Sequence, residues 1–133
     1  MTPHPPAAAA VGFDRLCGLQ ITELSEELVR GTVTVRDRIK QPAGLVHGGL
    51  YAAVAESLAT SGTARAVSAD GSIVLAQSNK TSFLRPITQG TIHAAARARH
   101  RGRTTWVWEA ELSDEAGRVC VLSRVTVAVR GAI

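Results

Sequence analysis

The sequence has few aromatic residues, few cysteines and no long apolar runs, and each shortage narrows the fold. Aromatic residues make up 4% of its 133 residues although 45% are hydrophobic, so we expect a core of small and branched aliphatic side chains whose backbones approach closely. No apolar run reaches the roughly 18 residues that a membrane-spanning helix needs. The length suits one core, so we predict a single domain over residues 12–133, preceded by a frayed N-terminal arm over residues 1–11.

Cysteine and histidine are too scattered to indicate a disulfide framework or a metal site. Cys17 and Cys120 lie far apart in the chain, and their apolar neighbours predict two buried thiols in a reducing compartment, with a nucleophilic cysteine as the alternative. The N-terminal residues lack the basic start, the apolar centre and the cleavage site of a secretory signal. We therefore expect a cytoplasmic protein without a metal or a cofactor.

Hydrophobic patterning predicts one long helix and an antiparallel sheet. Residues 47–67 are rich in alanine and lack proline, which predicts a helix of about 30 Å. Residues 19–38 alternate as a hairpin or a bent strand would, and four more strand-like stretches follow the helix: 72–84, 91–100, 104–114 and 119–129. Their short connections favour an antiparallel meander, and the helix is the candidate to cover its apolar face. We predict an α+β domain in which the sheet wraps around the helix.

The positive charge favours an anionic partner without identifying it. The formal net charge is +4, which suits nucleic acid, phospholipid or a phosphorylated small molecule. Arginines stand at every second position, namely Arg97, Arg99, Arg101 and Arg103. Those on an unbroken strand would share a face, with Gly102 turning the chain. The competing interpretation of these arginines is an ordinary solvated sheet face. A nucleic-acid site is less well supported, because single-strand binders place aromatic residues between their charged residues and this stretch has none.

A single carboxylate interrupts the predicted helix. Glu56 is the only charged residue of positions 48–64, and alanines and Thr60 occupy the positions three and four residues away from it. A carboxylate on such a face would be partly desolvated and would interact strongly with a bound group, so we interpret Glu56 as functional. The alternatives are a solvated outer face and an alanine-rich face that packs against a second subunit. The Thr60 hydroxyl could hold a water beside the carboxylate or bond back to the preceding turn.

Two glycines follow His47 at the start of the same helix. Gly48 and Gly49 are poor helix formers, which suggests that a ligand or a backbone approaches too closely for a Cβ. The first amides of a helix have no partner within it and lie at its positive end, so they suit a developing oxyanion. His47 and Glu56 lie on opposite sides of the helix, about 13 Å apart along it. A site that uses both would need a second subunit, which predicts a dimer with composite sites.

These residues and two later stretches together resemble a known family. The family is the hotdog-fold acyl-CoA thioesterases, which the following residues and motifs resemble: Gln41, VHGG, Glu56, Thr60, NKTSFLRP and HRGRTTWVWEAEL. The nearest branch is the 4-hydroxybenzoyl-CoA thioesterase type with a Glu on the central helix, and the aryl-CoA thioesterases of phenylacetate and menaquinone metabolism are also similar. The resemblance covers roughly residues 12–130. It implies a helix inside a curved sheet and dimers that pair into tetramers.

The resemblance also implies a role for each matching position. Glu56 would be the nucleophile or the general base, the Gly48 N–H would bind the thioester carbonyl, and Gln41 would orient or polarise that carbonyl. Thr60 would assist the hydrolytic water or the carboxylate, and His47 would position the loop and the thioester. The coenzyme A path would be lined by Gly49, Ser82, Arg85, Arg101, Gly102, Arg103 and Thr104.

The activity that the resemblance implies is hydrolysis of an aromatic or medium acyl-CoA to the free acid and CoA, with coenzyme A as part of the substrate. The main alternative is a non-catalytic acyl-CoA-binding or regulatory hotdog protein. Such a protein would have lost the helix acid or gained a DNA-binding segment, and this sequence shows neither. A hydratase or dehydratase would need a histidine and an acid placed for proton transfer at the acyl chain, which His47 does not clearly supply.

Overall fold

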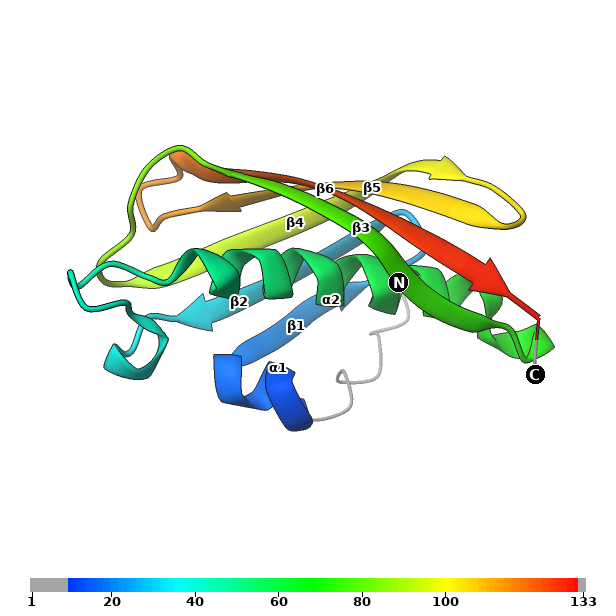
Figure 1. Ribbon diagram of the computed structural model, residues 1–133, viewed down its shortest axis with the longest axis horizontal. Helices are drawn as coiled ribbons and strands as arrows, with labels where there is room; N and C mark the ends of the chain where they lie inside the picture. The colour runs from blue at the N-terminus through cyan, green and yellow to red at the C-terminus, as the bar shows by residue number, and fades with distance from the viewer. Residues whose placement is uncertain (1–9, 132–133) are drawn as a thin grey trace.

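The protein is one long helix held against a curved, six-stranded antiparallel sheet (Figure 1). This is a computed structural model, and it describes residues 10–131. The elements are α1 (Gly12–Cys17), β1 (Leu19–Leu24), β2 (Leu28–Thr34), η1 (Asp37–Ile39), α2 (Gly48–Val67), η2 (Ser68–Asp70), β3 (Ile73–Phe83), β4 (Thr91–Arg101), β5 (Thr105–Ser113) and β6 (Val119–Arg130). The predicted α+β hotdog architecture is therefore confirmed.

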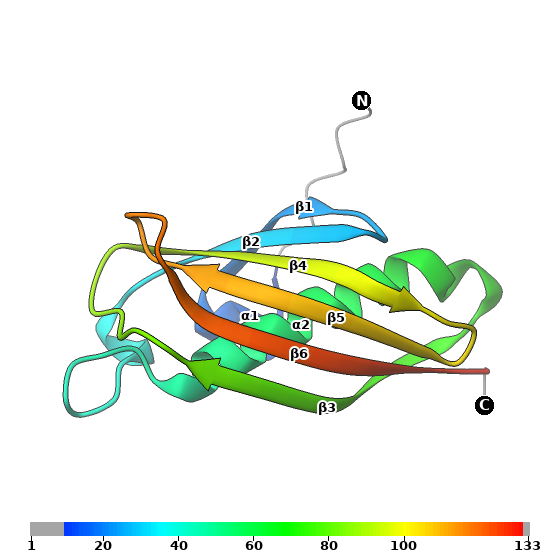
Figure 2. The ribbon, with the colours of Figure 1, turned by 90° about the horizontal axis from the view of Figure 1, so that it is seen from above.

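The strand order differs in one respect from the predicted meander. Across the sheet the order is β1-β2-β4-β5-β6-β3. The meander is correct for β4, β5 and β6 but wrong for β3, which pairs with β6 at the far edge of the sheet (Figure 2). The reason is α2, which separates β3 from β2 in the chain and carries it to the opposite edge. Residues 84–90 then return across the end of the sheet to β4.

The core forms where one face of α2 meets the sheet. The helix buries an aliphatic stripe that includes Val54, Leu58 and Ala59. On β5, Trp108 is fully buried and its Nε1–H donates to the Thr63 hydroxyl of α2 over 2.9 Å. The Thr63 hydroxyl in turn donates to the Ala59 carbonyl, so the indole is held by a satisfied chain of hydrogen bonds. The expected close approach of helix and sheet therefore occurs at the largest core side chain.

Both cysteines belong to this core. Cys17 is 7% exposed at the end of α1 and Cys120 is 0% exposed on β6, and both are free thiols. Burial raises the pKa of each thiol, so the nucleophilic thiolate is disfavoured at neutral pH. The structure therefore supports the prediction of buried thiols over the alternative of a cysteine nucleophile.

The N-terminal helix α1 packs against α2. The Ser57 hydroxyl of α2 donates to Asp14 of α1 over 2.6 Å, and α1 ends at Gly18 in the left-handed conformation. Most of the arm predicted for residues 1–11 lies outside the described residues. Within residues 10–131, no helix has the length and apolar character needed to cross a bilayer.

Candidate active site

A tight loop holds Gln41 beside the start of α2. The Gln41 N–H donates to the Leu45 carbonyl over 2.8 Å, and the Gly44 N–H donates to the Gln41 carbonyl over 2.9 Å. Gly44 has a φ of +91°, which favours glycine. The side-chain oxygen of Gln41 accepts a hydrogen bond from the Ala43 N–H. The NH₂ group of the Gln41 side chain is thereby left as the donor that can face a ligand.

The helix start presents one free amide. His47 is the N-cap of α2, and its Nδ1 accepts a hydrogen bond from the Gly49 N–H over 2.9 Å. The Leu50 N–H donates to the His47 carbonyl. Within residues 10–131, no acceptor is recorded for the Gly48 N–H. Because the N–H of Gly49 is already occupied, Gly48 is the amide of this turn that remains for a ligand at the positive end of the helix.

The cap gives a direct stability prediction. We expect His47→Ala to lower the free energy of unfolding by about 1 kcal/mol, because the Gly49 N–H loses its side-chain acceptor. His47→Asn keeps an acceptor at a position that favours asparagine and should restore most of the loss. Urea denaturation of the two variants measures the difference. Equal stability of the alanine and asparagine variants would contradict the capping role.

A pocket of about 330 Å³ opens beside Gly48. We call it the Gly48 pocket, and its walls are Gln41, Leu45, Val46, Gly48, Tyr51, Phe83, Leu84, Arg85 and Pro86. It brings together three of the predicted site residues, Gln41, Gly48 and Arg85. The Tyr51 side chain is buried in its wall, and burial raises the pKa of the phenol, which therefore stays protonated at neutral pH.

Glu56 lies elsewhere on the helix. It is exposed within the single chain, on a face where Ala52, Ala53 and Thr60 are only half-buried. No hydrogen bond or ion pair of its carboxylate is recorded within residues 10–131. The predicted desolvation is therefore not supplied by this subunit alone. The Thr60 hydroxyl donates to the Glu56 carbonyl over 2.9 Å, which is the back-bond to the preceding turn, although its lone pairs remain free to accept.

The predicted coenzyme A residues fall into three separate places. Arg85 lines the Gly48 pocket, and Gly49 follows Gly48 at the start of α2. Ser82, on β3, lines a different pocket, which lies on the outer face of the sheet. The hairpin of Arg101–Thr104 lies at the other end of the subunit, where the Thr104 carbonyl accepts from the Val129 N–H near the start of β3. Arg101 already pairs with Glu26 at 3.1 Å, in a surface contact worth at most about 1 kcal/mol.

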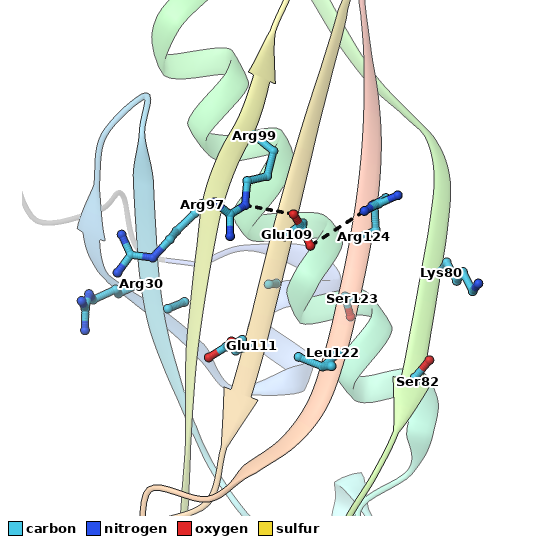
Figure 3. A pocket seen from close by; sticks show the side chains of 12 residues that line it. Arg30, Lys80, Ser82, Arg97, Arg99, Glu109, Glu111, Leu122, Ser123 and Arg124 are labelled. Atoms are coloured by element: carbon cyan, nitrogen blue, oxygen red, sulfur yellow. Dashed lines mark ion pairs between the residues drawn. The ribbon is translucent and has the colours of Figure 1, made fainter.

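The outer-face pocket, about 590 Å³, is shallow and basic (Figure 3). Its cationic side chains are Arg30, Lys80, Arg97, Arg99 and Arg124. Glu109 lies between two of them and pairs with Arg99 at 2.9 Å and with Arg124 at 3.9 Å. The four alternate arginines do not form one continuous row, because the register of β4 shifts between Ala98 and His100. The solvated sheet face considered from the sequence describes Arg97 and Arg99 well.

Metal ligands do not gather in the described part of the chain. Among residues 10–131, no three His, Cys, Asp or Glu side chains are grouped so that they could hold a metal ion. The chemistry that the Gly48 pocket and Glu56 offer is instead that of an amide donor at a helix start, a side-chain amide and a carboxylate. These are the groups that acyl transfer through an oxyanion needs.

A long helix held against a curved antiparallel sheet defines the hotdog architecture. The family model of the thioesterase superfamily matches residues 43–121, and the chain belongs to this family. It is 37% identical over 114 residues to the proofreading thioesterase EntH of Cronobacter turicensis, covering 86% of this chain and 82% of that protein.

Two further relatives agree with this assignment. The chain is 30% identical over 120 residues to the 1,4-dihydroxy-2-naphthoyl-CoA hydrolase of Listeria monocytogenes, covering 90% of this chain and 97% of that protein. A solved thioesterase structure from Pseudomonas aeruginosa superimposes with a TM-score of 0.85 at 31% identity, covering 90% of this chain and 86% of the other. The prediction that the chain is a thioester hydrolase is confirmed.

Proposed function

We propose that the protein hydrolyses an acyl-CoA thioester with an aromatic or medium acyl group to the free acid and CoA, in a site that two subunits build together. The observation that carries this proposal is that Gly48, with its free N–H, and Gln41 line one pocket at the start of α2, a helix whose only carboxylate on 48–64 is the exposed Glu56. The name of the Listeria relative, a 1,4-dihydroxy-2-naphthoyl-CoA hydrolase, favours an aromatic acyl group.

The proposed reaction uses each group once. The thioester carbonyl oxygen accepts hydrogen bonds from the Gly48 N–H and the Gln41 NH₂, and one well-placed donor to the oxyanion contributes about 3 kcal/mol. Glu56 then either attacks the carbonyl carbon, giving a mixed anhydride that water cleaves, or removes a proton from the attacking water. The C–S bond breaks in either route, and CoA leaves as a thiolate that takes up a proton.

Two features of the single subunit favour a composite site. Gly48 and Glu56 are about 12 Å apart along α2, which is too far for one carbonyl to contact both groups. The outer edge of β3 has no strand partner among residues 10–131, and Leu75 on this strand is 55% exposed. A second copy that pairs along this edge would cover the small-residue face around Glu56 and supply the desolvation that one chain lacks.

Pairing of two subunits along β3 would also bring Arg85 of one subunit close to the hairpin of Arg101–Thr104 of the other. Two β3 strands that pair antiparallel about a two-fold axis bring the start of one beside the end of the other. The hairpin of Arg101–Thr104 stands near the start of β3, and the Gly48 pocket near its end. The partner's hairpin would therefore approach the Gly48 pocket, where Arg85 and the hairpin arginines suit the phosphates of CoA. We propose that such dimers associate further into tetramers.

A panel of CoA thioesters tests the activity and its acyl preference. Purified protein is mixed with benzoyl-type, phenylacetyl and straight-chain acyl-CoA substrates, and the released thiol is followed by its absorbance with a disulfide reagent. We expect the highest kcat/KM with an aromatic substrate. Absence of thiol release from every member of the panel would overturn the proposed function.

Subunit mixing tests the composite site. Glu56→Gln and Gln41→Ala are each expected to be nearly inactive. When equal amounts are unfolded and refolded together, about half of the dimers are mixed, and each holds one intact site of two, so about a quarter of wild-type activity should return. A mixture of Glu56→Gln with Glu56→Ala is the matched control and should recover nothing. A Glu56→Gln and Gln41→Ala mixture that stays at background would place the site within one chain.

A further inference from the structure

The ring of Phe83 lies directly against the backbone of Gly48. A Cβ built on Gly48 would stand 2.8 Å from Phe83 Cζ, 3.1 Å from Cε1 and 3.2 Å from Cε2. Contacts below 3.0 Å are not tolerated without movement, so any side chain at position 48 would displace the ring. The edge that faces Gly48 is the far end of the ring, because Cζ is its nearest atom.

The backbone conformation of Gly48 does not by itself require glycine. The glycines with positive φ are Gly12, Gly18, Gly44, Gly71, Gly90 and Gly117, and Gly48 is not among them. Gly48 is the first residue of α2, and most other residues have a higher helix propensity than glycine. Among residues 10–131, the ring of Phe83 is therefore what a Cβ at position 48 would meet and have to displace.

Phe83 is also unusually exposed for an aromatic side chain. It is 59% exposed at the end of β3, and its other neighbour in the Gly48 pocket is the buried Tyr51, whose ring centroid lies 6.1 Å away. A ring that is mostly exposed contributes little to the stability of the subunit. Its position, with its tip on Gly48, places an apolar surface beside the one free amide of the helix start.

We propose that Phe83 is a substrate-positioning residue, whose ring forms the apolar wall that holds the thioester group against the Gly48 N–H, and that residue 48 is glycine to admit this ring. The inference rests on the proposed function, because it gives the ring a role toward the same carbonyl. An apolar wall excludes water from one side of the carbonyl, and a hydrogen bond to the oxyanion is stronger where water is excluded. The wall also limits the orientations that the flat thioester group can adopt.

The single substitutions separate positioning from folding. Phe83→Ala should lower kcat about tenfold with a smaller change in KM, because a misplaced carbonyl reacts slowly even when bound. Its melting temperature and its elution volume in size-exclusion chromatography should match those of the wild type. Phe83→Leu keeps an apolar wall and should retain most of the activity. Phe83→Tyr should be worse than Phe83→Leu, since its hydroxyl extends from the ring atom nearest to Gly48.

A double-mutant cycle tests the link between the two residues. Gly48→Ala alone should also lower kcat, because the new methyl group displaces the ring. If that displacement is the whole effect, Gly48→Ala should cause no further loss in the Phe83→Ala background. If the substrate itself needs the space above Gly48, the two losses will multiply, and the inference is overturned. A wild-type kcat for Phe83→Ala would overturn it as well.

Two comparisons keep these outcomes distinct from a failure of the proposed function. Wild-type protein on the CoA thioester panel establishes the activity before any variant is compared. Leu122→Ala is the matched control, because Leu122 is another exposed apolar side chain, 44% exposed, on the outer face of the neighbouring strand β6. Leu122→Ala should keep the wild-type kcat. A loss of kcat in this variant would show that the sheet is sensitive to any truncation of an exposed apolar side chain.

Discussion

Glu56→Gln is expected to lower kcat for thioester hydrolysis by about 10²- to 10⁴-fold, the usual contribution of a positioned acid–base group. Glutamine has nearly the same shape as glutamate but can neither attack the carbonyl as an anion nor take a proton from water. Because Glu56 is exposed and no bond of its carboxylate is recorded within residues 10–131, folding should be unchanged. The measurement is kcat on the best substrate of the panel, together with the melting temperature.

The control uses the same chemical change at a distant carboxylate. Glu23→Gln alters a surface residue of β1 whose recorded partner is Arg30 at 3.6 Å, and it should leave kcat unchanged. Glu56→Asp adds a second comparison, because it keeps the charge but withdraws it by one methylene group, and it should be intermediate. Full activity of Glu56→Gln would remove Glu56 from the mechanism and leave the pocket residues as the candidates.

Gly62→Ala is expected to destabilise the protein by about 1–3 kcal/mol, the range for overfilling a packed core. This loss of stability is the opposite of the usual effect, because a glycine-to-alanine change inside an ordinary helix stabilises by about 1 kcal/mol. Here the new Cβ would lie 2.4 Å from Trp108 Cη2 and 2.9 Å from Val29 Cγ2. The indole is held in place by its hydrogen bond to Thr63. It therefore resists moving away, and urea denaturation should report the loss.

A smaller ring should relieve the clash. Trp108→Phe removes the outer atoms of the indole and destabilises the core by itself, but in that background Gly62→Ala should cost clearly less than in the wild type. Ser61→Ala, at the neighbouring half-buried position of α2, is the matched control and should change stability by less than about 0.5 kcal/mol. A Gly62→Ala protein as stable as the wild type would show that the helix and the sheet can separate at this point.

The sequence was most informative where a signal is local. The helix over 47–67 follows from its alanine-rich, proline-free composition, and it forms from Gly48 to Val67 with His47 as its cap. The hairpin of β1 and β2 and the three strands β4 to β6 follow from alternation and short turns. The edge position of β3 could not be predicted in this way, because pairing with β6 joins residues that are far apart in the chain.

The site was predictable only in part for a similar reason. The glycines after His47 indicated an amide donor, but only the structure distinguishes the free Gly48 N–H from the capped Gly49 N–H. Small neighbours in the sequence suggested that Glu56 is desolvated, yet whether such a face is covered depends on a second chain. Phe83 was part of a recognised motif, but nothing in its local sequence relates it to Gly48, 35 positions earlier.

The length of helix α2 between Gly48 and Glu56 fixes the spacing of the two active sites of the proposed dimer. If the first residue of α2 binds the carbonyl in one site and Glu56 provides the carboxylate in another, the number of residues between them sets how far apart the two sites stand. One inserted residue would lengthen the helix by only about 1.5 Å but would rotate Glu56 by about 100° around its axis. The carboxylate would then leave the open face. Insertions should therefore be tolerated in the turns of the sheet but not between Gly48 and Glu56.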